Sequence, residues 1–432
     1  MQHCFGPAAI LLPREEIPLE QWACLACDQF TSQPEYWQKA RQAAGDGPSA
    51  LDLVLPEAFL GAPDEAERIR AVHAAMAEYR KTVLTRRVNG YIYLERKTQS
   101  GVRQGLVGLV DLEAYSYQPG AESPVRPTEQ TVPERIPPRL AVRRGAALET
   151  PHVMLLLDDA QEPVLAPLAG QKAGMRPVYA GQLMLGGGSV EGWAVEQPQQ
   201  VKALTAAIAR QGSQAVFDRR WPGAAGRPPL AIAVGDGNHS LATAKAYWEE
   251  LKPTLPPAAR QDHPARYCLA ELCSLHSPAI GIEPIHRVLF GANYASVLLA
   301  LTEYSDYTGA GLCAGARAAG CPQTMRILCG GREVPLGFAH PHEPLAVGTL
   351  EAFVQRYLAG HAEVRVDYVH GEEACRQLAQ KGAVAFLLPP FAKSDIFKGV
   401  VQGGVLPRKS FSMGHAEEKR YYLECRSLLP QG

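Results

Sequence analysis

The 432-residue sequence lacks an excess of charge of either sign. It holds 43 Lys and Arg against 44 Asp and Glu, a formal net charge of −1. Binding to nucleic acid needs a broad positive field, so this balance argues against a nucleic-acid partner. Long apolar runs are also missing. No stretch approaches the roughly 20 apolar residues that cross a bilayer, so we expect no membrane partner.

The sequence has few paired cysteine motifs. Its ten Cys are scattered, which favours reduced thiols and a cytoplasmic location. One C-x-x-C motif joins Cys24 and Cys27, but a zinc site would need a second such pair. The surrounding segment, residues 18–30, predicts a helix that buries two small side chains. Residues 1–18 lack a basic n-region, so we expect mature protein rather than a signal peptide.

Helix and strand signals alternate along the chain, which predicts a mixed α/β fold. Residues 64–84 have helical spacing, and residues 90–115 and 178–196 are typical of hairpins. Gly186 to Gly188 fall at the second hairpin's turn, where a phosphate cradle is the less favoured alternative. A second α/β pattern begins near Gly291. We therefore predict a core with an N-terminal helical part over 1–290 and a C-terminal α/β domain over 291–432.

A proline-rich segment spans residues 124–139. Its five prolines predict neither a helix nor a central strand. The segment also carries Arg126 and several other charged side chains. A stiffened binding loop and a solvated linker are equally compatible with this composition.

The segment from Leu230 to Leu251 predicts a buried strand, a Gly-Asp-Gly-Asn-His-Ser loop and a helix that begins near His239 or Ser240. Ligands of open α/β sheets bind at such strand-to-helix turns. The first turn of a helix has unpaired N–H donors that suit a phosphate. A capped turn explains Gly235, Asp236 and Ser240 equally well, but it does not require Asn238 or His239.

Asp236 to Ser240, D-G-N-H-S, resemble the D-G-H-H-R signature of the domain-of-unknown-function 1015 family. Five further segments match that family in the same order along the chain. They are CDQFTSQPE at 27–35, PTEQT at 127–131, EPIHR at 283–287, VDYVHG at 366–371 and LPRKSF at 406–411.

The resemblance implies a ParB/sulfiredoxin-like core, because the family's signature is similar to the phosphate loop of that superfamily, which includes free serine kinases. It further implies an ATP or ADP site with Mg²⁺ and phosphoryl transfer to a small hydroxylated metabolite. The resemblance implies that Asp236 is a base or Mg²⁺ ligand, that His239 holds the phosphoryl group, and that Glu129 and Thr131 add a carboxylate and a hydroxyl. It implies a phosphate cradle made by Gly235, Gly237, Asn238 and Ser240, with phosphate also faced by His286, Arg287 and Lys409. The implied substrate-binding residues are Asp28 and Ser32.

Two departures from the signature leave alternatives open. Asn238 stands where the family has its first His, and Ser240 where it has an Arg suited to gripping phosphate. We therefore consider three hypotheses in order: a nucleotide-dependent small-molecule kinase, a nucleotide-binding or sensing protein with little turnover, and a metal or redox protein built on Cys24 and Cys27. The sequence does not predict the oligomeric state.

Overall fold

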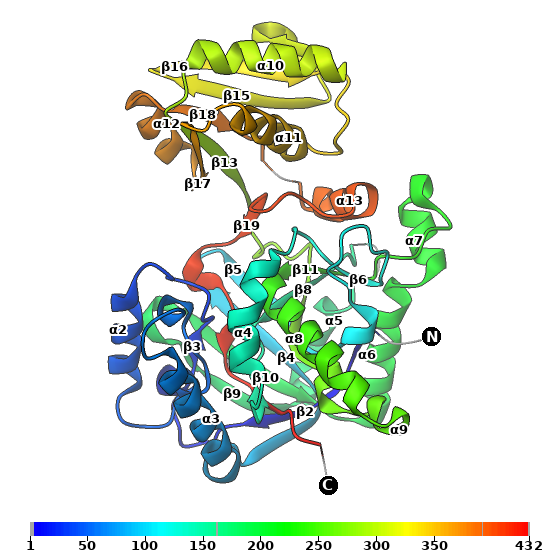
Figure 1. Cartoon of the computed structure of the whole chain (residues 1–432). Helices are drawn as coiled ribbons and strands as arrows, with labels where there is room; N and C mark the ends of the chain where they lie inside the picture. Colours follow the sequence, from blue (N-terminus) through cyan, green and yellow to red (C-terminus); the bar gives the residue numbers. More distant parts are fainter. Residues whose placement is uncertain (1–3, 161–162, 391, 431–432) are drawn as a thin grey trace. The chain divides into compact units, whose positions relative to one another are not determined.

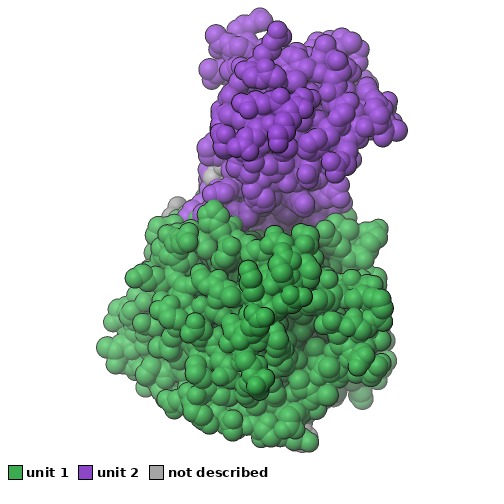
Figure 2. Space-filling model, turned by 90° about the vertical axis from the view of Figure 1, so that its left-hand side faces the viewer, with its two compact units in different colours: residues 1–127, 131–280, 414–432 green, residues 128–130, 281–413 purple. Residues whose placement is uncertain are grey.

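The computed structural model describes residues 4–160, 163–390 and 392–430, and the chain forms two compact units (Figure 1). The first comprises residues 1–127, 131–280 and 414–432, and the second comprises 128–130 and 281–413 (Figure 2). The predicted division at 290/291 is corrected in three places: the second unit begins at residue 281, it includes residues 128–130, and it ends at residue 413. Residues 414–432 belong to the first unit, because their two short strands pair with strands of that unit.

A mixed sheet organises the first unit, with the order β6-β11-β8-β12-β5-β4-β10-β9 and with β1 and β2 paired to β5 and β4. Its strands are β1 (Phe5–Gly6), β2 (Ala8–Leu12), β4 (Arg86–Thr98), β5 (Gly101–Asp111), β6 (Val125–Pro127), β8 (Val153–Leu157), β9 (Arg176–Gln182), β10 (Ser189–Val195), β11 (Ile232–Asp236) and β12 (Tyr267–Ser274). The pairs β6–β11 and β8–β12 are parallel. The two predicted hairpins, β4–β5 and β9–β10, are confirmed as antiparallel pairs.

Both faces of this sheet are buried. In β4, Tyr91 and Tyr93 contribute to one core cluster, while Ile92 and Leu94 contribute to another. Such alternation is what the period of two in a strand dictates. The helices of the unit are α1 (Leu19–Trp22), α2 (Pro34–Ala44), α3 (Glu65–Thr82), α4 (Ile136–Arg143), α5 (Ala166–Gln171), α6 (Pro198–Gln211), α7 (Gln214–Arg220), α8 (Asn238–Leu251) and α9 (Pro257–Arg260). α4 and α8 lie side by side (Figure 1).

The C-terminal segment is tied into the first unit by buried charges. β20 (Tyr421–Tyr422) pairs with β3 (Cys24–Leu25), and β21 (Arg426–Ser427) pairs with β7 (Leu148–Glu149). Arg420 is fully buried between Glu271 of β12, 3.1 Å away, and Glu424. Arg96 of β4 donates to the carbonyls of Glu417 and Lys419. These contacts fix the positions of Lys419 and Tyr422, which both reach the candidate site described below.

The second unit has its own sheet, with the order β14-β16-β15-β18-β13-β17 and with β19 paired to β13. Its strands are β13 (Ile282–Phe290), β14 (Leu312–Ala314), β15 (Gln323–Cys329), β16 (Arg332–Phe338), β17 (Arg365–His370), β18 (Val384–Leu387) and β19 (Phe411–Met413), and its helices are α10 (Tyr294–Thr308), α11 (Ala346–Ala359), α12 (Glu372–Gln380) and α13 (Lys393–Gly403). Leu289 and Val288 point into different core clusters, so this sheet is also covered on both faces. The mixed α/β class predicted from the sequence is confirmed.

Two local predictions are wrong. The C-x-x-C segment is not helical: α1 ends at Trp22, whose buried indole N–H donates to the Leu423 carbonyl, and Cys24 lies in β3. The proline-rich segment does contain a helix, since α4 begins at Ile136 with prolines in its first turn. Prolines are tolerated there because the first N–H groups of a helix have no intrahelical partner.

Residues 4–18 of the predicted mature N-terminus supply β1 and β2, and residues 1–3 lie outside the described part of the chain. In the described ranges, no helix combines the length and the apolar character needed to cross a bilayer.

Candidate functional site

The turn between β11 and α8 is built around Gly237. This residue has φ +76°, and a Cβ atom on it would lie 2.9 Å from the His152 ring and 3.1 Å from the Val153 Cα. A side chain therefore fits neither the backbone conformation nor the space. The predicted strand and helix are both present, although β11 extends through Gly235 to Asp236 and α8 begins at Asn238, slightly earlier than expected. The consequence is that the loop lies directly against His152.

The N-terminus of α8 suits an anion. Its N-cap residue, Gly237, has no side chain to accept from the first N–H groups, and no acidic residue lies in its first turn. The leading amides of an α-helix have no intrahelical partner and carry a partial positive charge. Asn238, His239 and Ser240 are each partly exposed.

Lys419 lies beside this helix end. Its Nζ atom is 3.4 Å from Asp236 Oδ2, and the lysine side chain is about nine-tenths buried. Asp236 Oδ2 has no hydrogen-bond partner within the described residues. Lys419 cannot be recognised as a site residue from the sequence alone, because it is more than 180 residues away from Asp236 in the chain and belongs to no loop motif. A buried ammonium group and the carboxylate with which it forms an ion pair thus flank the start of α8.

Asp28 forms an ion pair with His152. Asp28 Oδ2 is 3.1 Å from His152 Nε2, and Gln29 also donates to the Asp28 carboxylate. Burial raises the pKa of Asp28, but the imidazolium charge of His152 and these hydrogen bonds outweigh burial and hold the pKa well below its ordinary value. Burial lowers the pKa of His152, but the Asp28 charge outweighs it and holds that pKa well above its ordinary value. The charge of Lys419 also lowers the pKa of Asp28.

Cys27 and Tyr422 extend this pair. Tyr422 Oη is 2.6 Å from His152 Nδ1 and donates to Cys27 Sγ at 3.1 Å. The Cys27 amide donates to the same oxygen at 3.2 Å. The four side chains of Cys27, Tyr422, His152 and Asp28 therefore form a continuous polar chain on the first unit.

His239 is a neutral imidazole in this setting. Its Nε2 accepts a hydrogen bond from the Val132 N–H at 3.2 Å, which links α8 to the segment that begins at Thr131. Burial, followed by the charges of Arg139 and Arg135, lowers the pKa of His239 to about 4. Such a group positions a loop or donates from Nδ1, but it does not provide a cation at neutral pH.

A cavity of about 150 Å³ opens beside these residues. Its apolar lining comes from Leu53, Val54, Leu55, Leu60, Met76, Val142, Ala146 and Leu148. Its polar lining comes from Cys27, Glu57, Arg139, Arg143, Glu149, Thr150, His152, Ser240, Thr243 and Tyr422. Glu57 and Arg139 form an ion pair. Burial raises the pKa of Glu57 despite the opposing charge of Arg139. The cavity therefore joins the first turn of α8 to the Cys27–Asp28 chain.

The other predicted residues form a cluster of their own in the second unit. The Glu129 carboxylate accepts from the backbone N–H groups of Lys409 and Ser410 at 3.1 and 2.9 Å. Arg287 donates to the Lys409 carbonyl at 2.9 Å and pairs with Glu351. Burial raises the pKa of Glu129. These contacts hold the turn at residues 407–411 in place, and the phosphate-facing roles of Glu129, Arg287 and Lys409 stay predictions.

His286 and Ser32 show no comparable convergence. His286 is buried in β13, where its Nδ1 accepts from the Leu388 N–H at 3.2 Å, and burial lowers its pKa to about 4. Ser32 lies on an exposed turn before α2. Their predicted roles in binding phosphate and substrate stay predictions.

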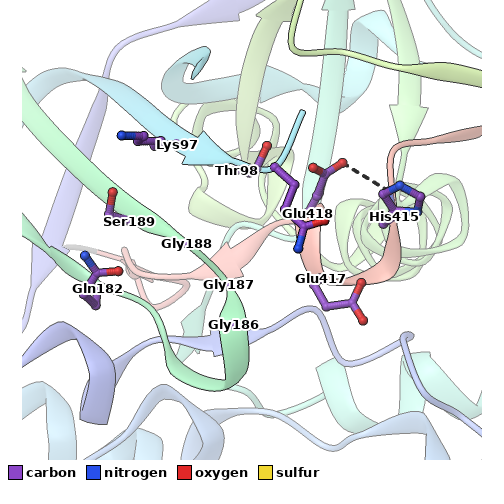
Figure 3. A pocket seen from close by; sticks show the side chains of 11 residues that line it. Lys97, Thr98, Gln182, Gly186, Gly187, Gly188, Ser189, His415, Glu417 and Glu418 are labelled. Carbon is purple, nitrogen blue, oxygen red and sulfur yellow. Dashed lines mark hydrogen bonds between the residues drawn. The ribbon is translucent and has the colours of Figure 1, made fainter. Parts of the chain in front are cut away.

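The Gly186–Gly188 triplet lines a separate pocket of about 530 Å³ (Figure 3). Glu417 and Glu418 lie on its opposite side, and the Glu418 carboxylate accepts from the His415 N–H. A Cβ atom on Gly187 would lie 2.5 Å from the Tyr421 ring. Close packing therefore explains this glycine, and the two carboxylates disfavour a phosphate here.

The possible metal-ligating side chains of the described residues do not form a metal site. Within the described residues, no three His, Cys, Asp or Glu side chains are grouped so that they could hold a metal ion. All ten Cys are free thiols. Mg²⁺ commonly binds through only one or two carboxylates together with substrate phosphates, and the role of Asp236 as a Mg²⁺ ligand stays a prediction.

A family model described as a protein of unknown function (DUF1015) matches residues 7–425. The chain therefore belongs to that family, as the ordered motifs predicted. No match to a curated protein was found.

Several solved structures resemble parts of the fold at low identity. A free serine kinase in complex with AMP is 10% identical, with a TM-score of 0.37, and the match covers 73% of this chain and 90% of that one. SbnI from Staphylococcus aureus, truncated at its C-terminus, is 12% identical with a TM-score of 0.36, covering 73% and 82%. A conserved hypothetical protein from Pyrococcus furiosus is 9% identical with a TM-score of 0.36, covering 74% and 93%. TM-scores below 0.5 do not establish a shared ligand.

Proposed function

We propose that the first unit is a nucleotide-dependent phosphotransferase that acts on a small hydroxylated metabolite, as a serine kinase does. The observation that supports this proposal best is the uncapped N-terminus of α8 beside the Lys419–Asp236 pair. An anion site, a cation and a carboxylate are thereby grouped at the carboxyl end of a sheet strand. Phosphoryl transfer needs chiefly the positioning and charge neutralisation that such a group provides.

The phosphates of ATP or ADP would bind to the leading N–H groups of Asn238, His239 and Ser240. Gly235 and Gly237 let the backbone approach them. Lys419 supplies the positive charge that an Arg would supply at position 240 in the family signature. A compact ammonium group binds phosphate as a point charge, although without the paired geometry of a guanidinium.

Asp236 and Asp28 have different roles in the transfer. Asp236 takes the proton of the acceptor hydroxyl. The oxygen of that hydroxyl forms the new P–O bond, and the bond between the transferred phosphorus and the nucleotide oxygen breaks. Mg²⁺ bound with the nucleotide would neutralise developing charge on the phosphates. Asp28, ionised through its pairing with His152, accepts a hydrogen bond from the acceptor and orients it. His239 holds the Thr131–Val132 segment beside the loop.

A nucleotide-binding protein with little turnover is the second candidate. It is favoured by Asn238 and Ser240, which replace the His and Arg of the signature. Both candidates use the same loop and differ only in whether a phosphoryl group leaves the nucleotide.

The test combines calorimetry with nucleotide consumption. ATP and ADP are titrated into the full chain with and without Mg²⁺, and nucleotide turnover is followed with a panel of hydroxylated metabolites that includes serine. We expect saturable binding, and turnover that falls at least 100-fold in Asp236→Asn. Asp262→Asn, at an exposed acid in the same unit, should match the parent chain. Binding without turnover supports the second candidate, and absence of binding contradicts both.

A further inference from the structure

The polar chain formed by Asp28, His152, Tyr422 and Cys27 ends beside the cavity at Cys27. Tyr422 Oη contacts three groups at once: Cys27 Sγ at 3.1 Å, His152 Nδ1 at 2.6 Å and the Cys27 amide at 3.2 Å. Cys27 Sγ and His152 Nδ1 are 3.9 Å apart, so the tyrosine hydroxyl is the closer partner of each. The far ring nitrogen of His152 faces Asp28.

The distances are compatible with two proton arrangements. In the first, the Cys27 thiol donates to Tyr422, whose hydroxyl donates to a neutral His152. In the second, an imidazolium donates to Tyr422, whose hydroxyl donates to a Cys27 thiolate. The two differ by one proton moved through the tyrosine oxygen, and Asp28 stabilises the charged ring in the second. A nucleophile, a base and an orienting carboxylate are the parts of an activated cysteine.

We propose that Cys27 is a nucleophilic modification site, activated by His152 and Asp28 through a proton relay at Tyr422, that reacts with small soft electrophiles entering the cavity. Iodoacetamide and hydrogen peroxide are the simplest members of that class. The proposal does not depend on phosphoryl transfer, because it concerns the thiol alone.

The peroxide reaction balances with groups that are present. The Cys27 thiolate attacks one peroxide oxygen, the O–O bond breaks, and the sulfur is oxidised by two electrons to a sulfenic acid, which keeps the hydrogen of the attacked oxygen. The leaving hydroxide takes the proton held by His152 and departs as water. With iodoacetamide, the sulfur forms a C–S bond and iodide leaves.

Other cysteines are poorly placed for this chemistry. Cys24 is fully buried in β3, and burial raises its pKa well above the ordinary value. Cys268 is also buried, and its pKa is raised to about 12. Besides Asp28, His152 and Tyr422, the charged groups around the cavity at Cys27 are two ion pairs: Glu57 with Arg139, and Arg143 with Glu149 at 2.7 Å. Among the cysteines of the described residues, Cys27 combines a cavity position with a base and an acid in line.

The experiment measures the rate of iodoacetamide labelling at each cysteine of the full chain by mass spectrometry between pH 6 and 9.5. Cys329, a partly exposed thiol of the second unit, serves as the internal reference. An ordinary thiol is only about 1% thiolate at pH 6.5. We expect Cys27 to react about 10- to 100-fold faster than Cys329 at pH 6.5, and to form a sulfenic acid that dimedone traps after peroxide treatment.

Tyr422→Phe removes the hydroxyl of the proton relay but keeps the aromatic ring, so it tests the relay without removing the packing of the ring. We expect labelling of Cys27 in this variant to fall at least 10-fold at pH 6.5 but to recover to within a few-fold of the parent at pH 9.5, where hydroxide forms the thiolate directly. His152→Gln should behave in the same way. If Cys27 follows the pH profile of Cys329, or if the variants lower its rate equally at every pH, the proposal is wrong.

Discussion

Lys419 Nζ lies 3.4 Å from Asp236 Oδ2, which joins the last part of the chain to the end of β11. The pair lies at the start of α8, where a helix presents unpaired N–H groups. This contact gives the Gly-Asp-Gly-Asn-His-Ser loop the cation that its own sequence lacks.

Replacing Lys419 with Met should weaken ATP binding by about 10- to 100-fold, because a charge-assisted contact to phosphate contributes roughly 1.5–3 kcal/mol. Lys419→Arg should retain part of the affinity. Calorimetry of both variants checks this, and the salt dependence of binding should be shallower in the Met variant. Equal affinity of all three proteins would show that Lys419 does not face the nucleotide.

Replacing Glu271 with Gln should lower the free energy of unfolding by about 3–5 kcal/mol, because it leaves the buried Arg103 and Arg420 guanidinium groups without their shared carboxylate. Glu250→Gln, which removes the exposed pair with Arg144, is the matched control and should leave the free energy of unfolding nearly unchanged, because solvent screens such a pair. Urea unfolding followed by circular dichroism measures both. A small effect of the Glu271 change would mean that water reaches this cluster.

Gly237→Ala should destabilise the protein by about 1–3 kcal/mol from strained backbone alone, and by more because the added methyl group meets His152 and Val153. Gly226→Ala is the control, since Gly226 has φ +80° but open space around its Cα. Its cost should be the backbone strain only. Thermal unfolding of the two variants compares them, and identical shifts would contradict the close packing at Gly237.

His286 should make stability depend on pH. Its pKa is lowered to about 4 in the folded chain, so the unfolded chain binds more protons between about pH 4 and 6.5. The contribution of His286 is therefore fully present above pH 6.5 and is lost as the pH falls toward 4. We expect the stability difference between the parent and His286→Gln to shrink between pH 7 and pH 5 in urea titrations. A difference that stays constant with pH would mean that His286 titrates normally.

Local sequence determined the elements that carry the loop. The apolar run before Gly235 and the helical spacing after Ser240 predicted β11 and α8, because burial periodicity is a local property. The ordered motifs predicted the family, which the match over residues 7–425 confirmed. The C-x-x-C helix was predicted wrongly, because pairing of β3 with β20 decides that segment and such pairing is non-local.

The composition of the site was decided by tertiary structure. Asp28, His152, Asp236, Lys419 and Tyr422 come from segments spread over almost the whole chain. They meet because buried ion pairs such as Arg420–Glu271 hold the C-terminal segment against the sheet. A sequence pattern records which side chains alternate or recur along one element, but it does not record which distant segment supplies the opposite charge. That information resides in packing, so Lys419 and Tyr422 emerged only from the folded chain.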